Sequence, residues 1–110
     1  MTKQWTEVIL GTKKPIIAMC HLNPLPGDPN YNPKTGMQGV VDWARKDFLA
    51  LQNGGVDAVM FSNEFSMPYL LDVRHVTVAT MARVIAELYN DLHIPFGVNV
   101  LWDQIGRAHV

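Results

Sequence analysis

The amino-acid sequence predicts an α/β fold built on a parallel sheet, of which this chain supplies about three strands and two helices. Three short apolar runs alternate with two segments of helical periodicity. The runs start at Ile16, Val56 and Phe96, and both steps are 40 residues long. Equal steps of this kind are typical of successive βαβ units, in which a helix connects each strand to the next parallel strand.

The first expected strand covers residues 16–20, a continuous apolar run. Pro15 precedes it, and proline suits the start of a strand because it has no N–H to donate to a neighbouring strand. The loop that follows, residues 22–36, carries prolines at positions 24, 26, 29 and 33 and cannot be helical. Cys20 is the only cysteine, so a disulfide or a cysteine-based zinc site within the chain is excluded, and we expect a small core residue.

The first expected helix begins at Thr35, because Thr35 and Gln38 have the spacing of a capping box. Behind them, apolar residues recur at helical spacing and predict an amphipathic helix. These residues are Val40, Val41, Ala44, Phe48 and Leu51. The helix is expected to end at Asn53-Gly54-Gly55, since asparagine and glycine tolerate the left-handed conformation found at helix C-termini.

A second strand is expected over residues 56–61, an apolar run broken only by Asp57. A second helix is expected from Val78 to Leu92, about four turns in which apolar side chains repeat at helical spacing. The repeat consists of Val78, Met81, Ala82, Ile85, Leu88, Tyr89 and Leu92. Pro95 then opens the third expected strand, residues 96–102.

Strands that are apolar on both faces indicate a parallel sheet covered by helices, which can be an open doubly wound sheet or a closed barrel. Neither G-x-G-x-x-G nor G-x-x-x-x-G-K-[ST] follows any of the strands. The usual signature of a nucleotide-binding doubly wound fold is therefore absent. The sequence favours a TIM (β/α)8 barrel.

Residues 1–103 are accordingly expected to be the N-terminal part of a single barrel domain. A helix should begin after the third strand, but residues 104–110 have neither helical nor strand periodicity. The last six of them, Ile-Gly-Arg-Ala-His-Val, are identical to the translation of one reading frame of a widely used sequencing-library adapter. We therefore interpret residues 104–110 as a non-native read-through tail.

Charge and hydropathy limit the classes of partner. The net charge is -1 and the lysines and arginines do not cluster, which argues against binding to nucleic acid or to an anionic membrane surface. No apolar run approaches the ~18 residues of a membrane span, and the N-terminus lacks the apolar core of a signal peptide. We expect a cytoplasmic protein with a small-molecule ligand.

In parallel β/α folds the functional site lies where the strands end, because the connecting loops and the helix N-termini gather there. Polar residues follow each expected strand. They are Cys20-His21-Leu22-Asn23 after the first, Ser62-Asn63-Glu64 after the second, and Asn99 to Asp103 at the end of the third. We expect these three groups to converge on one rim of the sheet.

His21 is a candidate catalytic acid or base, or a metal ligand, since imidazole titrates near neutrality. An equally weighted alternative is that it caps its strand by bonding a loop carbonyl. Metal-dependent hydrolase barrels often carry His-x-His on the first strand, whereas Asn23 stands two residues after His21. The sequence thus leaves both metal and cofactor open.

Glu64 and Asp103 are further catalytic candidates, as a carboxylate pair that could bind a divalent cation or act as acid and base. Asn23, Asn63 and Asn99 are expected to bind substrate through their amide groups, although asparagine is also frequent in turns at strand ends. For Asn99 the functional interpretation is favoured, because an amide buried between two valines needs partners.

The chain resembles one known family. Residues 15–29, PIIAMCHLNPLPGDP, are similar to the PIIGMVHLPPLPGSP opening of the BtpA family, and Gly97 to Leu101 is similar to its GVNVL strand. Gly54-Gly55-Val56-Asp57 and the spacing of the segments also fit, so the resemblance covers Lys14 to Asp103. The His-Leu-x-Pro-Leu-Pro-Gly string is its specific part.

After the second strand the chain departs from the commonest pattern of that family, Glu-Asn-Phe-Gly-Asp-x-Pro-Phe. Residues 62–69 read Ser-Asn-Glu-Phe-Ser-Met-Pro-Tyr. This is closer to the SgcQ branch, found in bacterial gene regions for sugar uptake and metabolism. His21, Asn63 and Asn99 match the family pattern, whereas Ser62 stands where the family has a glutamate.

The resemblance implies a TIM-type barrel grouped with ribulose-phosphate-binding barrels, in which a phosphate commonly sits near the last two strands. Such a protein would bind or act on a phosphorylated sugar-like or nucleoside-like metabolite, and the present part would be inactive alone. The alternative is a non-enzymatic biogenesis or stability factor for a membrane complex of the photosystem I type. Whether the protein is an enzyme stays open.

Overall fold

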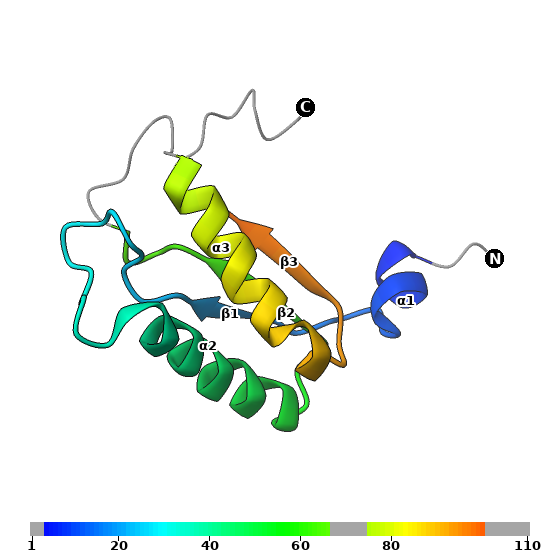
Figure 1. Cartoon of the computed structure of the whole chain (residues 1–110). Helices are drawn as coiled ribbons and strands as arrows, with labels where there is room; N and C mark the ends of the chain where they lie inside the picture. The colour runs from blue at the N-terminus through cyan, green and yellow to red at the C-terminus, as the bar shows by residue number, and fades with distance from the viewer. Residues whose placement is uncertain (1–3, 67–74, 101–110) are drawn as a thin grey trace.

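The computed structural model describes residues 4–66 and 75–100 and has an α/β fold (Figure 1). β1 pairs with β2 and β2 with β3, and both pairs are parallel. The elements in chain order are α1 (Trp5–Leu10), β1 (Ile17–His21), α2 (Gly36–Asn53), β2 (Ala58–Ser62), α3 (His75–Leu88), the 3-10 helix η1 (Tyr89–Asp91) and β3 (Phe96–Asn99). The predicted alternation of parallel strands and helices is confirmed.

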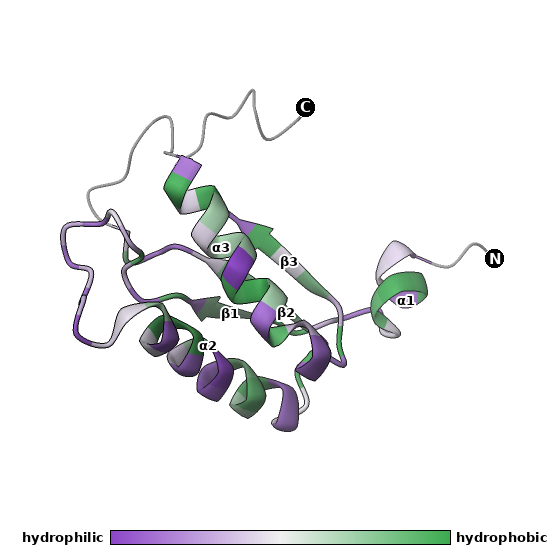
Figure 2. Cartoon of the chain, in the orientation of Figure 1, coloured by the Kyte–Doolittle hydropathy of each residue, from purple (hydrophilic) through white to green (hydrophobic). Residues whose placement is uncertain are grey.

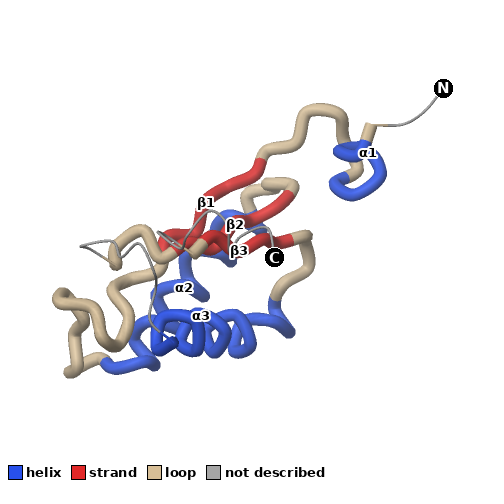
Figure 3. Tube along the Cα trace, turned by 90° about the horizontal axis from the view of Figure 1, so that it is seen from above, coloured by secondary structure: helices blue, strands red, loops and turns tan. Residues whose placement is uncertain are grey.

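The two long helices, α2 and α3, lie on the same face of the sheet (Figure 3). The strands follow one another in chain order across the sheet, so each new strand is added on the same side of the previous one. The face opposite the helices bears apolar side chains, with Ile17 46% and Met19 43% exposed. A sheet face of this composition is normally buried under a second layer, and the described residues do not provide one.

The core lies between the sheet and the two helices. Phe48 of α2 packs edge-on against Phe61 of β2, with ring centroids 6.3 Å apart. Cys20 is fully buried beside them, as predicted. The other core residues are Leu22, Leu25, Val40, Val41, Ala44, Val59, Met81, Val84 and Leu88. Figure 2 shows the matching pattern on α2, whose polar residues gather on the side turned away from the sheet.

α2 closely follows the prediction. Its buried residues are Val40, Val41, Ala44 and Phe48, and Leu51 packs against the core from the side. The helix ends at Asn53, and Gly55 then takes the left-handed conformation with φ +92°. The predicted capping box is wrong, because the Thr35 backbone is already helical and its hydroxyl donates to Asn32 O at 3.3 Å.

α3 begins earlier than predicted, and its predicted inner face is confirmed only in part: Met81 and Leu88 are buried. It ends at Leu88, and η1 replaces the expected last turn. Its buried residues are Thr77, Met81, Val84 and Leu88. Three residues of the predicted inner face are exposed, namely Val78, Ala82 and Tyr89. The apolar stripe of this helix is wider than the strands beneath it, so Val78 and Ala82 line an apolar groove beside Val98 of β3.

α1 is a helix that the sequence pattern did not predict, since six residues are too few to establish a period. It is held by local hydrogen bonds: Glu7 Oε1 accepts the Gln4 N–H at 3.4 Å, and Glu7 O accepts the Gly11 N–H at 3.1 Å. Gly11 ends the helix with φ +77°. None of its residues is buried, and it lies apart from the sheet near the amino end of β1 (Figure 1).

The strand boundaries differ from the prediction by a few residues. β1 and β2 both end on a polar residue, His21 and Ser62. Asp57, the break in the second apolar run, lies before β2, where its carboxylate accepts the Ile16 N–H at 2.8 Å. β3 ends at Asn99 instead of running to residue 102, and residues 101–110, which include Asp103 and the expected tail, lie outside the described residues.

Candidate functional site

The carboxyl ends of the three strands bring His21, Ser62 and Asn99 into one row. His21 of β1 stands opposite Ser62 of β2, and Ser62 stands opposite Asn99 of β3. Because side chains alternate along a strand and matched residues of parallel neighbours share a face, all three belong to one face. Cys20 and Phe61, each one position earlier, are buried beneath the helices, so the row is on the opposite, open face. The predicted convergence of polar strand ends is confirmed for these positions.

His21 is half-buried at the end of β1. Its ring packs edge-on against Phe65, with centroids 5.9 Å apart and planes at 88°. Phe65 belongs to the segment after β2, where the Ser66 N–H donates to Asn63 O at 2.9 Å and closes a turn. The imidazole is therefore oriented by an aromatic neighbour that comes from the adjacent strand's loop.

Ser62 belongs to the polar group predicted after the second strand, but the sequence analysis gave it no role of its own. It is fully buried, and its hydroxyl has no hydrogen-bond partner within residues 4–66 and 75–100. A buried hydroxyl without a partner costs about 1–3 kcal/mol, so native structures rarely retain one without a reason. The signal that could have found it is the alternation along β2, because the burial of Phe61 on one face directs Ser62 to the other.

Asn63 and Glu64 follow β2 directly. Asn63 is 1% exposed and Glu64 is half-buried. Both residues have interaction partners in the structure. Asp103, the second carboxylate of the predicted pair, lies outside the described residues, so that pair stays a prediction.

Asn99 occupies the predicted place but not the predicted environment. The sequence indicated a buried amide, and the side chain is exposed. The physical reason is that β3 pairs only with β2 among the described strands. Among residues 4–66 and 75–100, therefore, no layer covers its outer edge or its open face. The argument for Asn99 from burial is wrong, whereas its alignment with Ser62 supports the same site assignment.

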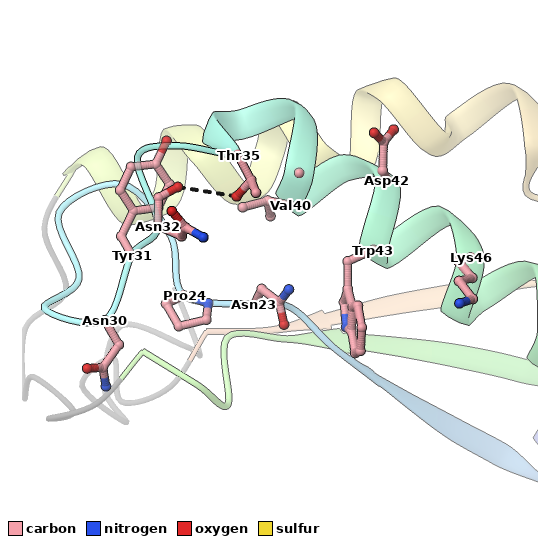
Figure 4. A pocket seen from close by; sticks show the side chains of 11 residues that line it. Asn23, Pro24, Asn30, Tyr31, Asn32, Thr35, Val40, Asp42, Trp43 and Lys46 are labelled. Atoms are coloured by element: carbon pink, nitrogen blue, oxygen red, sulfur yellow. Dashed lines mark hydrogen bonds between the residues drawn. The ribbon is translucent and has the colours of Figure 1, made fainter.

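Asn23 is not part of the row. It lines a separate pocket of about 400 Å³, between the loop after β1 and the outer side of α2 (Figure 4). Thr35, Trp43 and Lys46 of the α2 region contribute to the opposite wall. Of the predicted site residues that the structure describes, only Asn23 lines this pocket. The structure thus divides the predicted substrate-binding asparagines between two places.

Asp28 connects the two loops that border the row, and the sequence analysis gave it no role. Its Oδ2 accepts the Leu25 N–H at 2.7 Å and the Ser66 hydroxyl at 2.5 Å. Gly27, with φ +95°, makes the turn that brings Asp28 back toward Leu25. The Pro-Gly-Asp string is a turn signature that could have indicated a structural carboxylate.

Cys20 precedes His21 but belongs to the helix-covered face. Burial raises the pKa of its thiol to about 12, with the nearby Asp47 carboxylate as the second cause. The thiol is therefore protonated at neutral pH and is not available as a nucleophile. Adjacent residues of β1 thus have different roles, Cys20 in the core and His21 in the row.

Two features are absent from the part of the chain that the structure describes. Within residues 4–66 and 75–100, no three side chains from His, Cys, Asp and Glu come together as a set of metal ligands. Across the same residues, no helix combines the length and the apolar character needed to cross a bilayer. The chemistry that the described row offers is that of an imidazole, a hydroxyl and an amide.

Comparison with known proteins places these residues in a family context. The model of the BtpA family matches residues 12–109. The sgc region protein SgcQ of Escherichia coli K12 is 60% identical over 101 residues, which cover 92% of this chain and 38% of SgcQ. The photosystem I biogenesis protein BtpA of a Synechocystis species is 32% identical over 98 residues, 88% of this chain and 33% of that protein.

An uncharacterized protein of Methanocaldococcus jannaschii is 37% identical over 99 residues, 89% of this chain and 37% of its own length. The chain therefore spans 33–38% of the length of these three relatives. No solved structure matches the chain.

Proposed function

The chain belongs to the BtpA family, and we propose that the full-length protein is a TIM-type barrel that binds or acts on a phosphorylated sugar-like or nucleoside-like metabolite. Residues 1–103 would form the first part of that single barrel domain. The observation that carries the proposal is the alignment of His21, Ser62 and Asn99 at the carboxyl ends of three parallel strands, the position of the site in β/α barrels.

The barrel part of the proposal rests on the order of the strands and on the helices. In a doubly wound sheet the strand order reverses and helices cover both faces. Here β1, β2 and β3 follow in chain order with both long helices on one face, as in a sheet that curls toward closure. The apolar groove formed by Val78, Ala82 and Val98 beside β3 is where a next βα unit would pack.

The ligand part rests on the chemistry of the row. An imidazole can donate or accept a proton near neutral pH, and a hydroxyl and an amide can bind the hydroxyls of a sugar-like molecule. The buried hydroxyl of Ser62, which has no partner among the described residues, supports a role for this row beyond packing. Glu64 and Asp103 would complete the proposed catalytic set as acid and base.

A thermal-shift screen of the full-length protein against sugar phosphates and nucleoside monophosphates tests the proposal. We expect a hit whose affinity falls tenfold or more, about 1.4 kcal/mol, in His21→Ala and in Asn99→Ala. Matched controls are His93→Ala and Asn90→Ala, because both side chains are exposed and lie near the other end of the sheet. Unchanged affinity in both site variants would remove this site from consideration.

A second function is favoured by one relative. The matched Synechocystis protein is named for photosystem I biogenesis, which supports a non-enzymatic biogenesis or stability factor for a membrane complex. A scaffold of this kind does not depend on an imidazole in the row. It predicts normal levels of membrane complexes, measured on native gels, in a host strain that carries both His21→Ala and Asn99→Ala. The metabolite proposal instead predicts that these two substitutions lower the affinity for the ligand.

A further inference from the structure

We propose that Asp28 is a positioning residue that joins the loop after β1 to the loop after β2 and thereby holds the His21 ring in place through Phe65. The inference rests on the proposed function only in assigning His21 to the ligand site. The connection itself consists of contacts between described residues.

The first link is the Asp28 carboxylate. A single oxygen, Oδ2, accepts one hydrogen bond from the Leu25 N–H at 2.7 Å and one from the Ser66 hydroxyl at 2.5 Å. Leu25 is fully buried and Ser66 is 7% exposed, so water competes weakly for these donors. A charged acceptor gives stronger hydrogen bonds than a neutral one. Two segments that are 38 residues apart in sequence are thereby joined.

The second link is the turn that carries Phe65. The Ser66 N–H donates to Asn63 O at 2.9 Å, which closes the chain immediately after β2. Phe65 lies inside this turn, one residue before the serine that Asp28 binds. The position of its ring therefore depends on both ends of the turn, on β2 at one side and on Asp28 at the other.

The third link is the contact of Phe65 with His21. The rings meet edge-on with centroids 5.9 Å apart and planes at 88°. Such a contact favours one orientation of the imidazole and limits rotation about its side-chain bonds. A ligand at the row would then meet an imidazole already set in place, and functional groups held in this way lose less freedom on binding.

Asp57 provides a natural comparison for Asp28. Its carboxylate also joins the two neighbouring strands, by accepting the Ile16 N–H at 2.8 Å, but at the amino ends of β1 and β2. Replacing either aspartate by asparagine removes one charge and weakens one connection between the same strands. Only the Asp28 connection leads to Phe65 and His21.

The test is the NMR signal of the His21 ring in the full-length protein with ring-labelled histidine, assigned by its loss in His21→Ala. An aromatic edge contact shifts these signals, and Phe65→Leu gives their position without it. We expect Ser66→Ala and Asp28→Asn to move the His21 signals toward the Phe65→Leu position. Ser66→Thr keeps the hydroxyl and should keep the wild-type position, and Asp57→Asn should leave it unchanged.

Unmoved His21 signals in Ser66→Ala would overturn the inference, as would an equal displacement in Asp57→Asn. The serine pair decides the matter even if Asp28→Asn fails to fold, because Ser66→Thr keeps the hydroxyl that Ser66→Ala removes. The readout needs no ligand, so failure of this inference is distinguishable from failure of the metabolite proposal, which is judged by affinity in His21→Ala and Asn99→Ala.

Discussion

The amino and carboxyl ends of the same three strands use their polar groups differently. At the amino end, residues 54–57 and 92–95 are short connections that take part in hydrogen bonds with neighbouring helix and strand ends. Asp57 bonds Ile16 through its carboxylate at 2.8 Å, and the Gln52 amide accepts the His93 N–H at 2.8 Å and donates to Asp91 O at 3.1 Å. These bonds tie helix ends to strand starts.

At the carboxyl end the connections are longer, and side chains extend from the strands onto the open face. His21, Ser62 and Asn99 lie side by side in the pairing register, and the Ser62 hydroxyl lacks a partner among the described residues. Under the proposed function, the amino end serves folding while the carboxyl end holds the groups that bind a ligand, the usual division in β/α folds.

The largest expected effect concerns the core that both ends share. Phe61→Ala removes a fully buried ring that packs against Phe48 and Phe96, with ring centroids 6.3 Å and 6.1 Å apart. We expect a loss of about 3–5 kcal/mol in unfolding free energy. Hydrogen exchange of the full-length protein should speed up at both ends of the sheet. Faster exchange confined to one end would contradict a single core supporting both.

The effect of the Cys20 thiol on stability should depend on pH, because Cys20 lies on the helix-covered face of the sheet. Burial raises its pKa from 9.0 to about 12, so the folded state holds the thiol proton more tightly than the unfolded state. Its contribution to stability is complete below pH 9 and is lost as the pH rises from 9 toward 12, by roughly 1 kcal/mol per pH unit.

The measurement for this prediction is urea unfolding of the full-length wild type and of Cys20→Ala at pH 8 and pH 10. The stability difference between the two proteins should shift in favour of the alanine variant at the higher pH. A difference that does not change with pH would mean that the thiol is not sequestered on the helix-covered face.

At the amino end, Gln52→Leu removes the amide that bonds His93 and Asp91. We expect a loss of about 1 kcal/mol, because both groups left behind are partly accessible to water. Affinity for any ligand found in the screen should stay within twofold of wild type. A large loss of affinity would show that the amino end takes part in binding, against the proposed division of the sheet.

The smallest effect, and one of opposite sign, is expected for Ser62→Ala. Removing a buried hydroxyl that has no partner among the described residues should raise the unfolding free energy of the ligand-free protein by up to about 1 kcal/mol, while ligand affinity falls. Thermal unfolding with and without ligand measures both. A variant that is destabilised without ligand would indicate that the hydroxyl has a structural partner in the full-length protein.

Much of the fold could be predicted from short stretches of sequence. α2 was located by its apolar spacing and by the glycines after Asn53, because a helix depends mainly on contacts within one turn and on one apolar stripe. α3 was also found, and its buried face was predicted in part, since Met81 and Leu88 are buried whereas Val78 is exposed. Val78 and Val84 are equally apolar, and only the width of the underlying sheet determines which of them is covered.

The candidate site, like the fold, could be predicted from sequence only in part. Sequence was sufficient to place His21 and Asn99 in one row, since polar residues that end apolar strands of a parallel fold gather on one rim. Their role in binding or catalysis stays a prediction. Sequence could not select Ser62, remove Asn23 from the row or find Asp28, because these assignments depend on strand register and on contacts across 38 residues. Periodicity reports which residues share a helix or strand, whereas the pairing of distant segments is settled only when the chain packs against itself.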